Sequence, residues 1–299
     1  MEFICSDCPR RCGALRTEKT GVGFCASPAM PRIARAAPHF GEEPCLAGEK
    51  GAGAIFFSGC NLRCVYCQNR DISRGVAAGK SVGVEELRGI MLRLRDEGVH
   101  CIDLVTPTHY LHAVRQALTG LSLGIPVVWN SSGYESVEAL RSLEGLVQIY
   151  MPDYKYSDAA LARRLSAAED YPAVAAAAIR EMFRQTGPFR MDENGLLLSG
   201  VLIRHLILPG EIENSLGAID FIAENFPAGS VLFSLMSQYT PMPGMERFGS
   251  LAQRVDAETN EHLIRYMRRC GIETGYWQEP SSATAAEIPA FDGTGVFNR

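Results

Sequence analysis

Short apolar runs alternate with amphipathic stretches along most of this chain. The apolar runs are bounded by glycine, proline or polar residues, which is typical of buried parallel strands. They occupy residues 53–59, 101–107, 125–129, 147–152, 201–208, 231–236 and 273–278. The intervening stretches place leucine, isoleucine, valine and methionine every three or four residues, which predicts helices. The expected helices are 82–97, 110–123, 137–143, two within 158–187 divided near Pro172, 215–226 and 257–270.

This alternation of strands and helices predicts a parallel sheet, and six or seven such units can curl into a partial or full barrel. In such barrels, chemistry belongs at the carboxyl ends of the strands. Two local signals refine the pattern. Asn194-Gly195 predicts the turn of a small hairpin within 189–200. Ser215 is the expected N-cap residue of the helix that it precedes.

Composition divides the chain into three segments. Residues 1–50 contain five of the ten cysteines and little periodicity, so we expect an irregular, cysteine-rich N-terminal extension. Residues 51–280 carry the strand and helix pattern without a linker or internal repeat, so we expect one core there. Residues 281–299 are rich in alanine, threonine and glycine, and we expect a partly loose C-terminal tail.

The overall composition is that of a globular protein with a full core. The chain has 299 residues, 46% of them hydrophobic, and a net charge of -5. This charge gives no basic excess to attract nucleic acid, and no apolar run reaches the roughly 18 residues of a membrane helix. The N-terminus lacks the basic and apolar regions of a signal peptide, and clustered cysteines favour metal ligation over disulfides. We therefore expect a protein of the reducing cytoplasm.

Three cysteines, Cys60, Cys64 and Cys67, directly follow the first core strand with the spacing C-x3-C-x2-C. Closely spaced thiolates favour iron–sulfur clusters or zinc. A structural zinc site normally has four protein ligands, whereas three thiolates on a [4Fe–4S] cluster leave one iron open to a substrate. The spacing favours the cluster, and the alternative is a zinc knuckle with its fourth ligand elsewhere.

A second set of thiols lies in the N-terminal extension. Cys5, Cys8, Cys12 and Cys25 supply four ligands, enough to close a tetrahedral zinc site or a [4Fe–4S] cluster. A segment so poor in core residues would need such a centre to fold. The alternative is a set of free structural or redox thiols.

Polar groups follow or end several predicted strands, and they would meet at one rim of the barrel. The candidates are Thr106, Thr108, Asn130, Ser132, Asp153, Lys155 and Arg204. Any one of them could belong to a solvated loop, but their repetition favours a shared polar cavity. His109 is either an active-site donor or a loop histidine, and we expect His205 to be a hydrogen-bonded core residue.

The stretch Ser58-Gly59-Cys60-Asn61-Leu62-Arg63-Cys64-Val65-Tyr66-Cys67 resembles the signature of the radical S-adenosylmethionine (SAM) superfamily. Together with Asp153-x-Lys155, Arg204 and Pro209-Gly210, it looks like the pyruvate formate-lyase-activating enzyme branch. The segments Cys5-x2-Cys8-Pro9-Arg10-Arg11-Cys12 and Phe40-Gly41-Glu42-Glu43-Pro44-Cys45 are similar to a PflX-like subgroup. The resemblance runs from Cys5 to about Glu279 and implies a partial (β/α)6-type radical SAM barrel.

The resemblance also implies roles for individual residues. Cys60, Cys64 and Cys67 would hold a [4Fe–4S] cluster whose open iron binds SAM, and Tyr66 would lie near the adenine. The polar cavity would bind the rest of SAM through its ribose partners and its charged groups, namely Asn130, Ser132, Asp153, Lys155 and Arg204. The branch usually carries a Gly-Gly-Glu-Pro segment after the second strand. Here Thr106-Pro107-Thr108 stands in that place, so Thr106 and Thr108 would offer oxygen atoms without a carboxylate charge.

Three hypotheses about function follow. In the first, the protein cleaves SAM reductively to a 5′-deoxyadenosyl radical that abstracts hydrogen from a glycine of a glycyl radical enzyme. Flavodoxin or ferredoxin would supply the electron, by analogy with the family. In the second, the same chemistry acts on a small molecule or a peptide. In the third, the protein is a metal-stabilised binding or electron-transfer protein without SAM chemistry.

Overall fold

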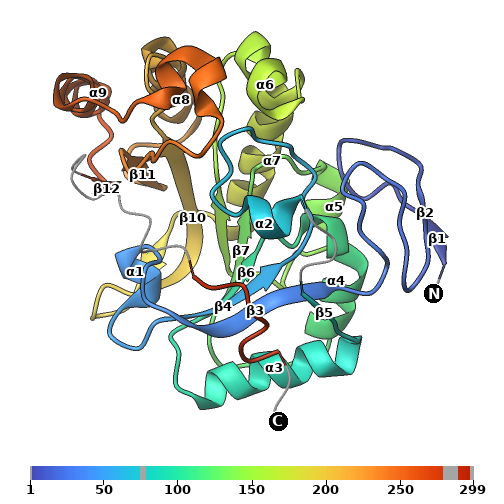
Figure 1. Cartoon of the computed structure of the whole chain (residues 1–299). Coiled ribbons are helices and arrows are strands. Elements are labelled where there is room, and N and C mark those ends of the chain that lie inside the picture. Colours follow the sequence, from blue (N-terminus) through green and yellow to red (C-terminus); the bar gives the residue numbers. More distant parts are fainter. Residues whose placement is uncertain (1, 75–78, 279–288, 297–299) are drawn as a thin grey trace.

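Seven parallel strands form most of one large sheet in the computed structural model, which describes residues 2–74, 79–278 and 289–296 (Figure 1). The strands are β4 (Ala52–Phe57), β6 (Ile102–Val105), β7 (Val127–Ser131), β8 (Ile149–Pro152), β10 (Leu197–Leu206), β11 (Leu232–Met236) and β12 (Gly275–Trp277). Each pairs in parallel with the next in this order. Within the described residues the sheet runs from β12 at one edge to β5 at the other and stays open. The expected α/β class and partial barrel are confirmed.

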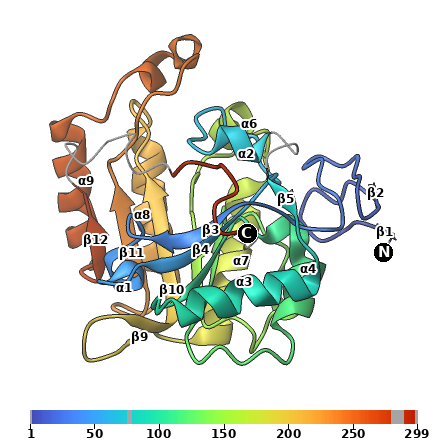
Figure 2. The same ribbon diagram turned by 60° about the horizontal axis from the view of Figure 1, so that its bottom comes forward.

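Helices cover the outside of this curved sheet, as Figure 1 and Figure 2 show. They are α3 (Val84–Asp96), α4 (Leu111–Leu118), α5 (Val137–Arg141), α6 (Ala159–Ser166), α7 (Tyr171–Thr186), α8 (Ile212–Asn225) and α9 (Ala257–Arg269). In α3 the side chains of Leu87, Met91 and Leu94 are completely buried. Their spacing of three and four residues places them on one face, and burial of each contributes about 1.5–3 kcal/mol.

The sheet also contains an edge that the sequence pattern did not predict. β3 (Arg32–His39) pairs antiparallel with β4, and β5 (Lys80–Ser81) pairs with the start of β3. The sheet therefore begins well before the expected core boundary at residue 51. Arg35 and Pro38 interrupt the apolar run of β3, which hid the strand. Proline is tolerated there because β5 pairs only with residues 32–33, so Pro38 lies on an open edge.

The remaining elements are short, and the N-terminal extension is mostly irregular, as expected. The short elements are β1 (Phe3–Ile4), β2 (Leu15–Arg16), α1 (Pro44–Ala47), α2 (Arg70–Ser73), β9 (Arg190–Met191), and the 3-10 helices Thr108–Tyr110 and Met245–Ala252. β9 pairs antiparallel with β10 across a turn in which Gly195 has a φ of 78°. The predicted hairpin at Asn194-Gly195 is confirmed. Among the described helices, none is long and apolar enough to cross a membrane.

The start of α8 differs from the sequence expectation. The helix begins at Ile212, so Ser215 lies inside its first turn and is not the N-cap residue. Ser215 is completely buried, and its Oγ lies 2.9 Å from His205 Nε2. The N-cap prediction for Ser215 is therefore wrong, because its hydroxyl group pairs with a histidine of a neighbouring strand and not with the backbone of its own helix.

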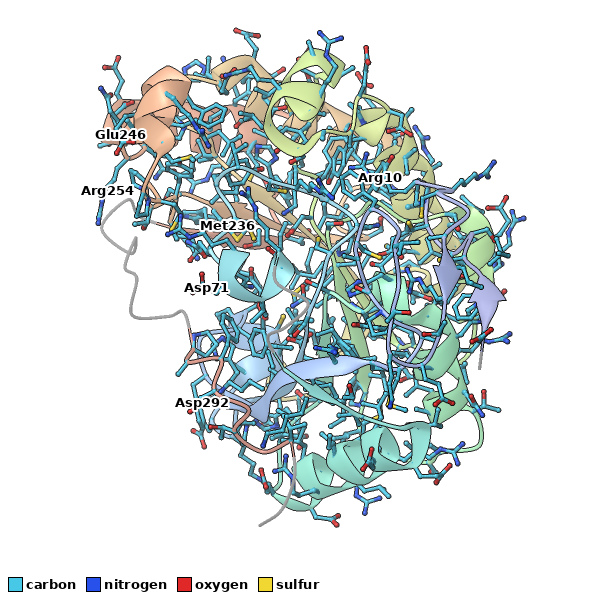
Figure 3. All side chains as sticks on the ribbon, turned by 45° about the vertical axis from the view of Figure 1, so that its right-hand side comes forward. Arg10, Asp71, Met236, Glu246, Arg254 and Asp292 are labelled. Atoms are coloured by element: carbon cyan, nitrogen blue, oxygen red, sulfur yellow. The ribbon has the colours of Figure 1, made fainter. Side chains whose placement is uncertain are left out.

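The tail packs against the edge strand where the structure describes it. Ala36 N donates to Thr294 O at 2.9 Å, and Gly293 N donates to Ala34 O at 2.8 Å. The Phe291 ring contacts Phe56 at 5.4 Å between centroids. Residues 289–296 therefore pack against β3. Asp292 of this segment, labelled in Figure 3, lies 3.8 Å from Arg35 Nη1. The expected boundary at 280–281 and residues 281–288 lie outside the described residues.

The hydroxyl group of Tyr171, at the start of α7, connects the ends of two core strands. It accepts a hydrogen bond from Lys155 N at 2.8 Å. The hydroxyl oxygen lies 2.8 Å from Ser132 O and 2.7 Å from Asp153 O, so its one proton can be donated to either carbonyl group. The side chain is completely buried, so no water can replace these bonds.

We expect Tyr171→Phe to lower the free energy of unfolding by about 1–3 kcal/mol, because buried backbone groups lose their partner. Urea denaturation measures this change. Tyr266→Phe is the matched control, since it removes a single bond to Asp220 on the outer helices. Equal losses in the two variants would contradict the role assigned to Tyr171.

Candidate functional site

A cavity of about 270 Å³ opens at the carboxyl ends of the parallel strands. It brings together segments that lie far apart in the sequence. Ten of the residues that the sequence analysis proposed for the strand ends and the three-cysteine loop line this cavity, and Thr108 does not. The ten are Cys60, Cys64, Tyr66, Cys67, Thr106, Asn130, Ser132, Asp153, Lys155 and Arg204. Glu42, Gln68, Leu206, Met236 and Gln238 also line it. The prediction of a shared polar cavity at this rim is confirmed.

The three-cysteine loop takes its shape from close contacts behind it. Gly59 has a φ of 91°, and a Cβ atom there would lie 2.3 Å from Ser27 Oγ. Only glycine fits this position. Each thiol then has a polar neighbour: Cys60 Sγ lies 3.3 Å from Leu62 N, Cys64 Sγ 2.9 Å from Ser166 Oγ, and Cys67 Sγ 3.4 Å from Ser73 Oγ.

Burial makes two of these thiols, those of Cys60 and Cys64, hard to ionise. It raises the pKa of Cys60, and the nearby Cys64 and Cys67 raise it further. Burial also raises the pKa of Cys64, although the Lys155 ammonium partly offsets this effect. Clustered buried thiolates require a positive charge between them, and a metal cluster supplies one. Three soft donors around one cavity therefore fit an iron–sulfur cluster with an open iron.

The arrangement of these thiols is not yet that of bound ligands. Across residues 2–74, 79–278 and 289–296, no group of three or more Cys, His, Asp or Glu side chains is already arranged around a metal position. This applies to the three-cysteine loop and to the N-terminal thiols alike. Ligation at either place therefore requires thiol side chains to turn toward a common point.

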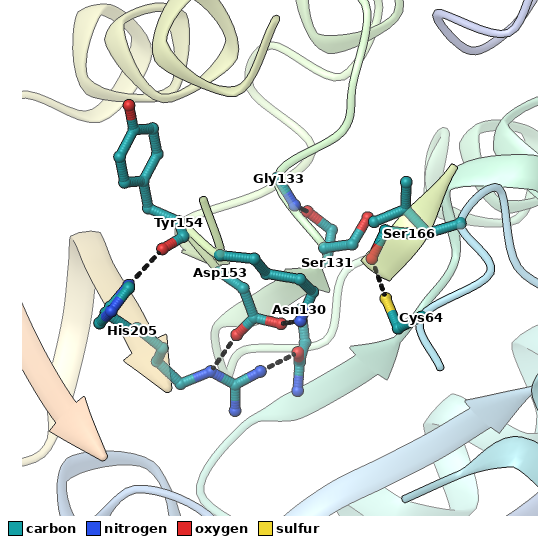
Figure 4. A network of polar contacts seen from close by, with 12 residues as sticks. Cys64, Asn130, Ser131, Gly133, Asp153, Tyr154, Ser166 and His205 are labelled. Atoms are coloured by element: carbon teal, nitrogen blue, oxygen red, sulfur yellow. Dashed lines mark hydrogen bonds and ion pairs between the residues drawn. The ribbon is translucent and has the colours of Figure 1, made fainter. Parts of the chain in front are cut away.

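A row of alternating charges lines the opposite part of the cavity. Lys155 Nζ lies 2.5 Å from Asp153 Oδ2, and Asp153 Oδ1 accepts from Arg204 Nε at 3.1 Å. Arg204 also donates hydrogen bonds to Glu42 Oε1 at 3.0 Å and to Asn130 Oδ1 at 2.8 Å. Burial alone would raise the pKa of Asp153, but Lys155 and Arg204 hold it below its ordinary value. Figure 4 shows Asp153 and Asn130 side by side, with Cys64 and Ser166 across from them.

Thr106 lines the cavity in a strained conformation. Its φ of 60° lies in the left-handed region, which a β-branched residue rarely adopts. The cost is about 1–2 kcal/mol. The position is fixed by a hydrogen bond from Thr106 N to Asn130 O at 2.8 Å. Strain of this kind concentrates at functional sites.

Thr108 does not belong to the site, which corrects the sequence interpretation. It is buried, and its hydroxyl donates to Glu135 Oε1 at 2.5 Å. Glu135 also accepts from Trp129 Nε1 at 3.3 Å. Because the strand end turns into a 3-10 helix at Thr108, this side chain points away from the cavity and supports a buried carboxylate.

The two candidate histidines are structural. His109 is completely buried, and its Nε2 lies 2.8 Å from Ser58 O behind the cysteine loop. Burial lowers the pKa of His109 to about 3, so it is neutral at physiological pH. His205 is also completely buried, with Nδ1 2.7 Å from Tyr154 O. The expectation that His205 is a hydrogen-bonded core residue is confirmed.

The N-terminal thiols lie close to one another. Cys5, Cys8 and Cys25 are buried and Cys12 is exposed. Burial raises the pKa of Cys8 to about 12, and the other three thiols add to the effect. Arg16 is buried beside them, and its Nη2 lies 3.0 Å from Cys25 Sγ. A buried guanidinium next to a thiol is stabilised when that thiol is ionised.

The N-terminal extension also holds the cysteine loop from behind. Arg10 Nε donates to Asn61 O at 2.9 Å, and Nη2 donates to Ser166 O at 3.3 Å. Its guanidinium lies 3.8 Å from the centre of the Phe24 ring. Sequence reasoning assigned no role to Arg10 or to Glu42. Both lie in the quoted N-terminal motifs, and that was the available signal.

Comparison with known proteins finds one family and several similar proteins. The family description "Radical SAM superfamily" matches residues 54–219. The uncharacterized protein MJ0674 of Methanocaldococcus jannaschii is 29% identical over 282 residues, which cover 91% of this chain and 76% of that protein. SuiB of Streptococcus suis bound to precursor peptide SuiA is similar at a TM-score of 0.53 and 14% identity. That match covers 74% of this chain and 46% of SuiB, so the chain spans about half of SuiB, and the likeness concerns the fold alone.

A domain of a pyruvate-formate lyase-activating enzyme from Bacteroides vulgatus also matches, at a TM-score of 0.36 and 12% identity. That match covers 66% of this chain and 91% of the domain. A TM-score this low carries no structural argument.

Titration of His205 makes stability depend on pH. Burial lowers the pKa of His205 to about 4, so the unfolded chain binds a proton below about pH 6.5 that the native protein excludes. The resulting loss of folding stability is absent above pH 6.5 and grows as the pH falls. We expect the unfolding free energy of His205→Gln to fall less than that of the unaltered protein between about pH 7.5 and 5.5, by about 1.4 kcal/mol. Urea denaturation at both pH values measures this, and identical pH dependence would contradict it.

Proposed function

The chain belongs to the radical SAM superfamily, and from this premise we propose that it is a SAM-cleaving enzyme of the pyruvate formate-lyase-activating, PflX-like type. Cys60, Cys64 and Cys67 would hold a [4Fe–4S] cluster. When bound, this cluster supplies the electron that cleaves SAM into methionine and a 5′-deoxyadenosyl radical. The observation that carries the proposal is that three thiols and a row of fixed charges line one cavity.

The residues around the cavity suit the parts of SAM. Lys155 and Arg204 offer cations for its carboxylate, and Asn130 and Ser132 offer amide and hydroxyl partners for its ribose. Tyr66 is buried and lines the cavity, and its hydroxyl shares a hydrogen bond with Tyr156 at 2.8 Å. Because that bond fixes the ring, its face can pack near the adenine.

The size of the cavity favours a narrow substrate. Its volume is about 270 Å³, below the roughly 300–1,000 Å³ of pockets that enclose drug-sized ligands. A cavity of this size leaves no room for a bulky substrate beside SAM and a cluster, so the reacting carbon of the substrate would lie at the mouth. We therefore propose that the substrate is a glycine in an exposed segment of a partner glycyl radical enzyme, because glycine has no side chain that would block its Cα from reaching the cavity mouth.

The proposed reaction is a single hydrogen-atom transfer. The 5′-deoxyadenosyl radical takes a hydrogen atom from the glycine Cα, which yields 5′-deoxyadenosine and a glycyl radical. A flavodoxin or ferredoxin would supply the electron consumed in each cleavage of SAM. The role of the protein is to orient SAM toward the cavity mouth and to exclude water from the radical.

We expect the reconstituted, reduced protein to form 5′-deoxyadenosine from SAM, and Cys64→Ala to lose this activity by at least a hundredfold. The change removes one of three ligands. The reaction is run without oxygen, with dithionite and a peptide that contains one dideuterated glycine. Mass spectrometry of the 5′-deoxyadenosine should show one added deuterium.

Cys270→Ser is the matched control, since Cys270 lies at the end of α9, away from the cavity. This variant should retain full activity. Equal turnover by Cys64→Ala and the unaltered protein would refute the proposed cluster site. Formation of 5′-deoxyadenosine without deuterium uptake from the peptide would redirect the proposal to a small-molecule substrate.

We further propose that Cys5, Cys8, Cys12 and Cys25 hold a second metal centre, either zinc or a closed [4Fe–4S] cluster. Two features support this. The donor set has four soft thiolates, and a Cβ at Gly23 would lie 2.9 Å from Cys12 Sγ, so only glycine leaves this thiol room. The buried Arg16 guanidinium would balance the negative charge of a four-thiolate centre.

We expect Cys8→Ser to lower the metal content by about one zinc or about four irons per chain, because one of four ligands is lost. Elemental analysis of the purified protein measures this. Cys270→Ser again serves as the control and should leave the content unchanged. Equal metal content in Cys8→Ser and the unaltered protein would identify these cysteines as free thiols.

A further inference from the structure

Glu42 brings a carboxylate into the cavity from outside the parallel strands. It lies in the turn between β3 and α1, and its side chain is 11% exposed. Oε1 accepts from Arg204 Nη1 at 3.0 Å, and Oε2 accepts from Asn130 Nδ2 at 3.2 Å. Two residues of the barrel interior thus aim this carboxylate, and the side chain still lines the cavity.

The balance of charge leaves Glu42 as the less neutralised carboxylate of the cavity. Among the described residues that line it, the carboxylates are Glu42 and Asp153 and the cations of fixed charge are Lys155 and Arg204. Asp153 contacts both cations, at 2.5 Å and 3.1 Å. Of these two cations Glu42 contacts only Arg204, which it shares with Asp153. The buried Asp103 carboxyl group also lies beside Glu42 and accepts from the same Asn130 amide at 3.3 Å. A positively charged group entering the cavity is therefore best stabilised at Glu42.

Glu42 also lies close to the strained end of β6. Asn130 connects the two positions, because its side chain donates to Glu42 and its carbonyl oxygen accepts from Thr106 N at 2.8 Å. Thr106 offers the cavity only a neutral hydroxyl group. The end of β6 thus has no carboxylate at Thr106, but Glu42 of the N-terminal segment places one nearby, with Asn130 between them.

We propose that Glu42 binds the α-ammonium group of SAM. The inference rests on the proposed function and adds a recognition residue to it. The amino-acid end of SAM carries an ammonium and a carboxylate, and the cavity offers the complementary pair: Glu42 for the first, and Lys155 with Arg204 for the second. A charge-assisted hydrogen bond from the ammonium to Oε1 or Oε2 replaces part of the contact with Arg204, which then turns to the SAM carboxylate.

The test compares two ligands on the reconstituted [4Fe–4S] protein by equilibrium dialysis without oxygen. SAM carries the ammonium, whereas 5′-methylthioadenosine has the same nucleoside with a neutral thioether sulfur in place of the sulfonium, and no amino-acid end. We expect Glu42→Gln to weaken SAM binding by roughly tenfold or more. Its affinity for 5′-methylthioadenosine should change by less than about twofold. Glu42→Asp, which keeps the charge, should restore part of the SAM affinity.

Glu49→Gln is the matched control, since Glu49 is an exposed carboxylate that follows α1 in the same segment. It should bind both ligands as the unaltered protein does. SAM affinity in Glu42→Gln within about twofold of the control would overturn the assignment. Equal losses for SAM and 5′-methylthioadenosine would overturn it too, because they would reveal a purely structural role. If the unaltered protein binds no SAM, the proposed function fails first.

Discussion

The site depends on one buried cation, the guanidinium of Arg204. Its side chain is 15% exposed, so each N–H group needs a partner from the protein. These partners come from three different parts of the chain: Asn130 ends β7, Asp153 follows β8, and Glu42 precedes α1. Loss of Glu42 or of Asp153 would leave the guanidinium with one carboxylate in place of two, so the charge in the barrel would be less well compensated. The strands can curl around the cavity only in an arrangement that satisfies Arg204.

The three-cysteine loop is under a different constraint, because burial disfavours the charged form of two of its thiols. Burial raises the pKa of Cys60 and of Cys64, so the protein alone favours neutral thiols. A metal cluster reverses this balance and makes ligation part of the folding free energy of the loop. The backbone is shaped in advance by Gly59 and by Arg10, so little main-chain entropy remains to be lost when the thiols turn inward.

The N-terminal segment is therefore part of the site and not an appended module. Arg10 holds the cysteine loop, β3 extends the sheet beside β4, and Glu42 reaches the charged row. The described tail residues close the same edge, where Phe291 packs on Phe56. Segments from both ends of the sequence thus complete a cavity whose three-cysteine loop follows the first parallel strand.

The α/β class, the succession of strands and helices along the chain and the cysteine loop follow from the amino-acid pattern alone, because periodicity and ligand spacing are local properties. That pattern also located the residues of the strand ends, since parallel strands bring their carboxyl ends to one rim. Only the tertiary structure decided that Thr108 turns away to Glu135, that β3 is an edge strand, and that Glu42 enters the cavity. These outcomes depend on contacts between residues that are distant in the chain. Which groups meet a buried charge is set by their positions in space and not by their spacing in the sequence.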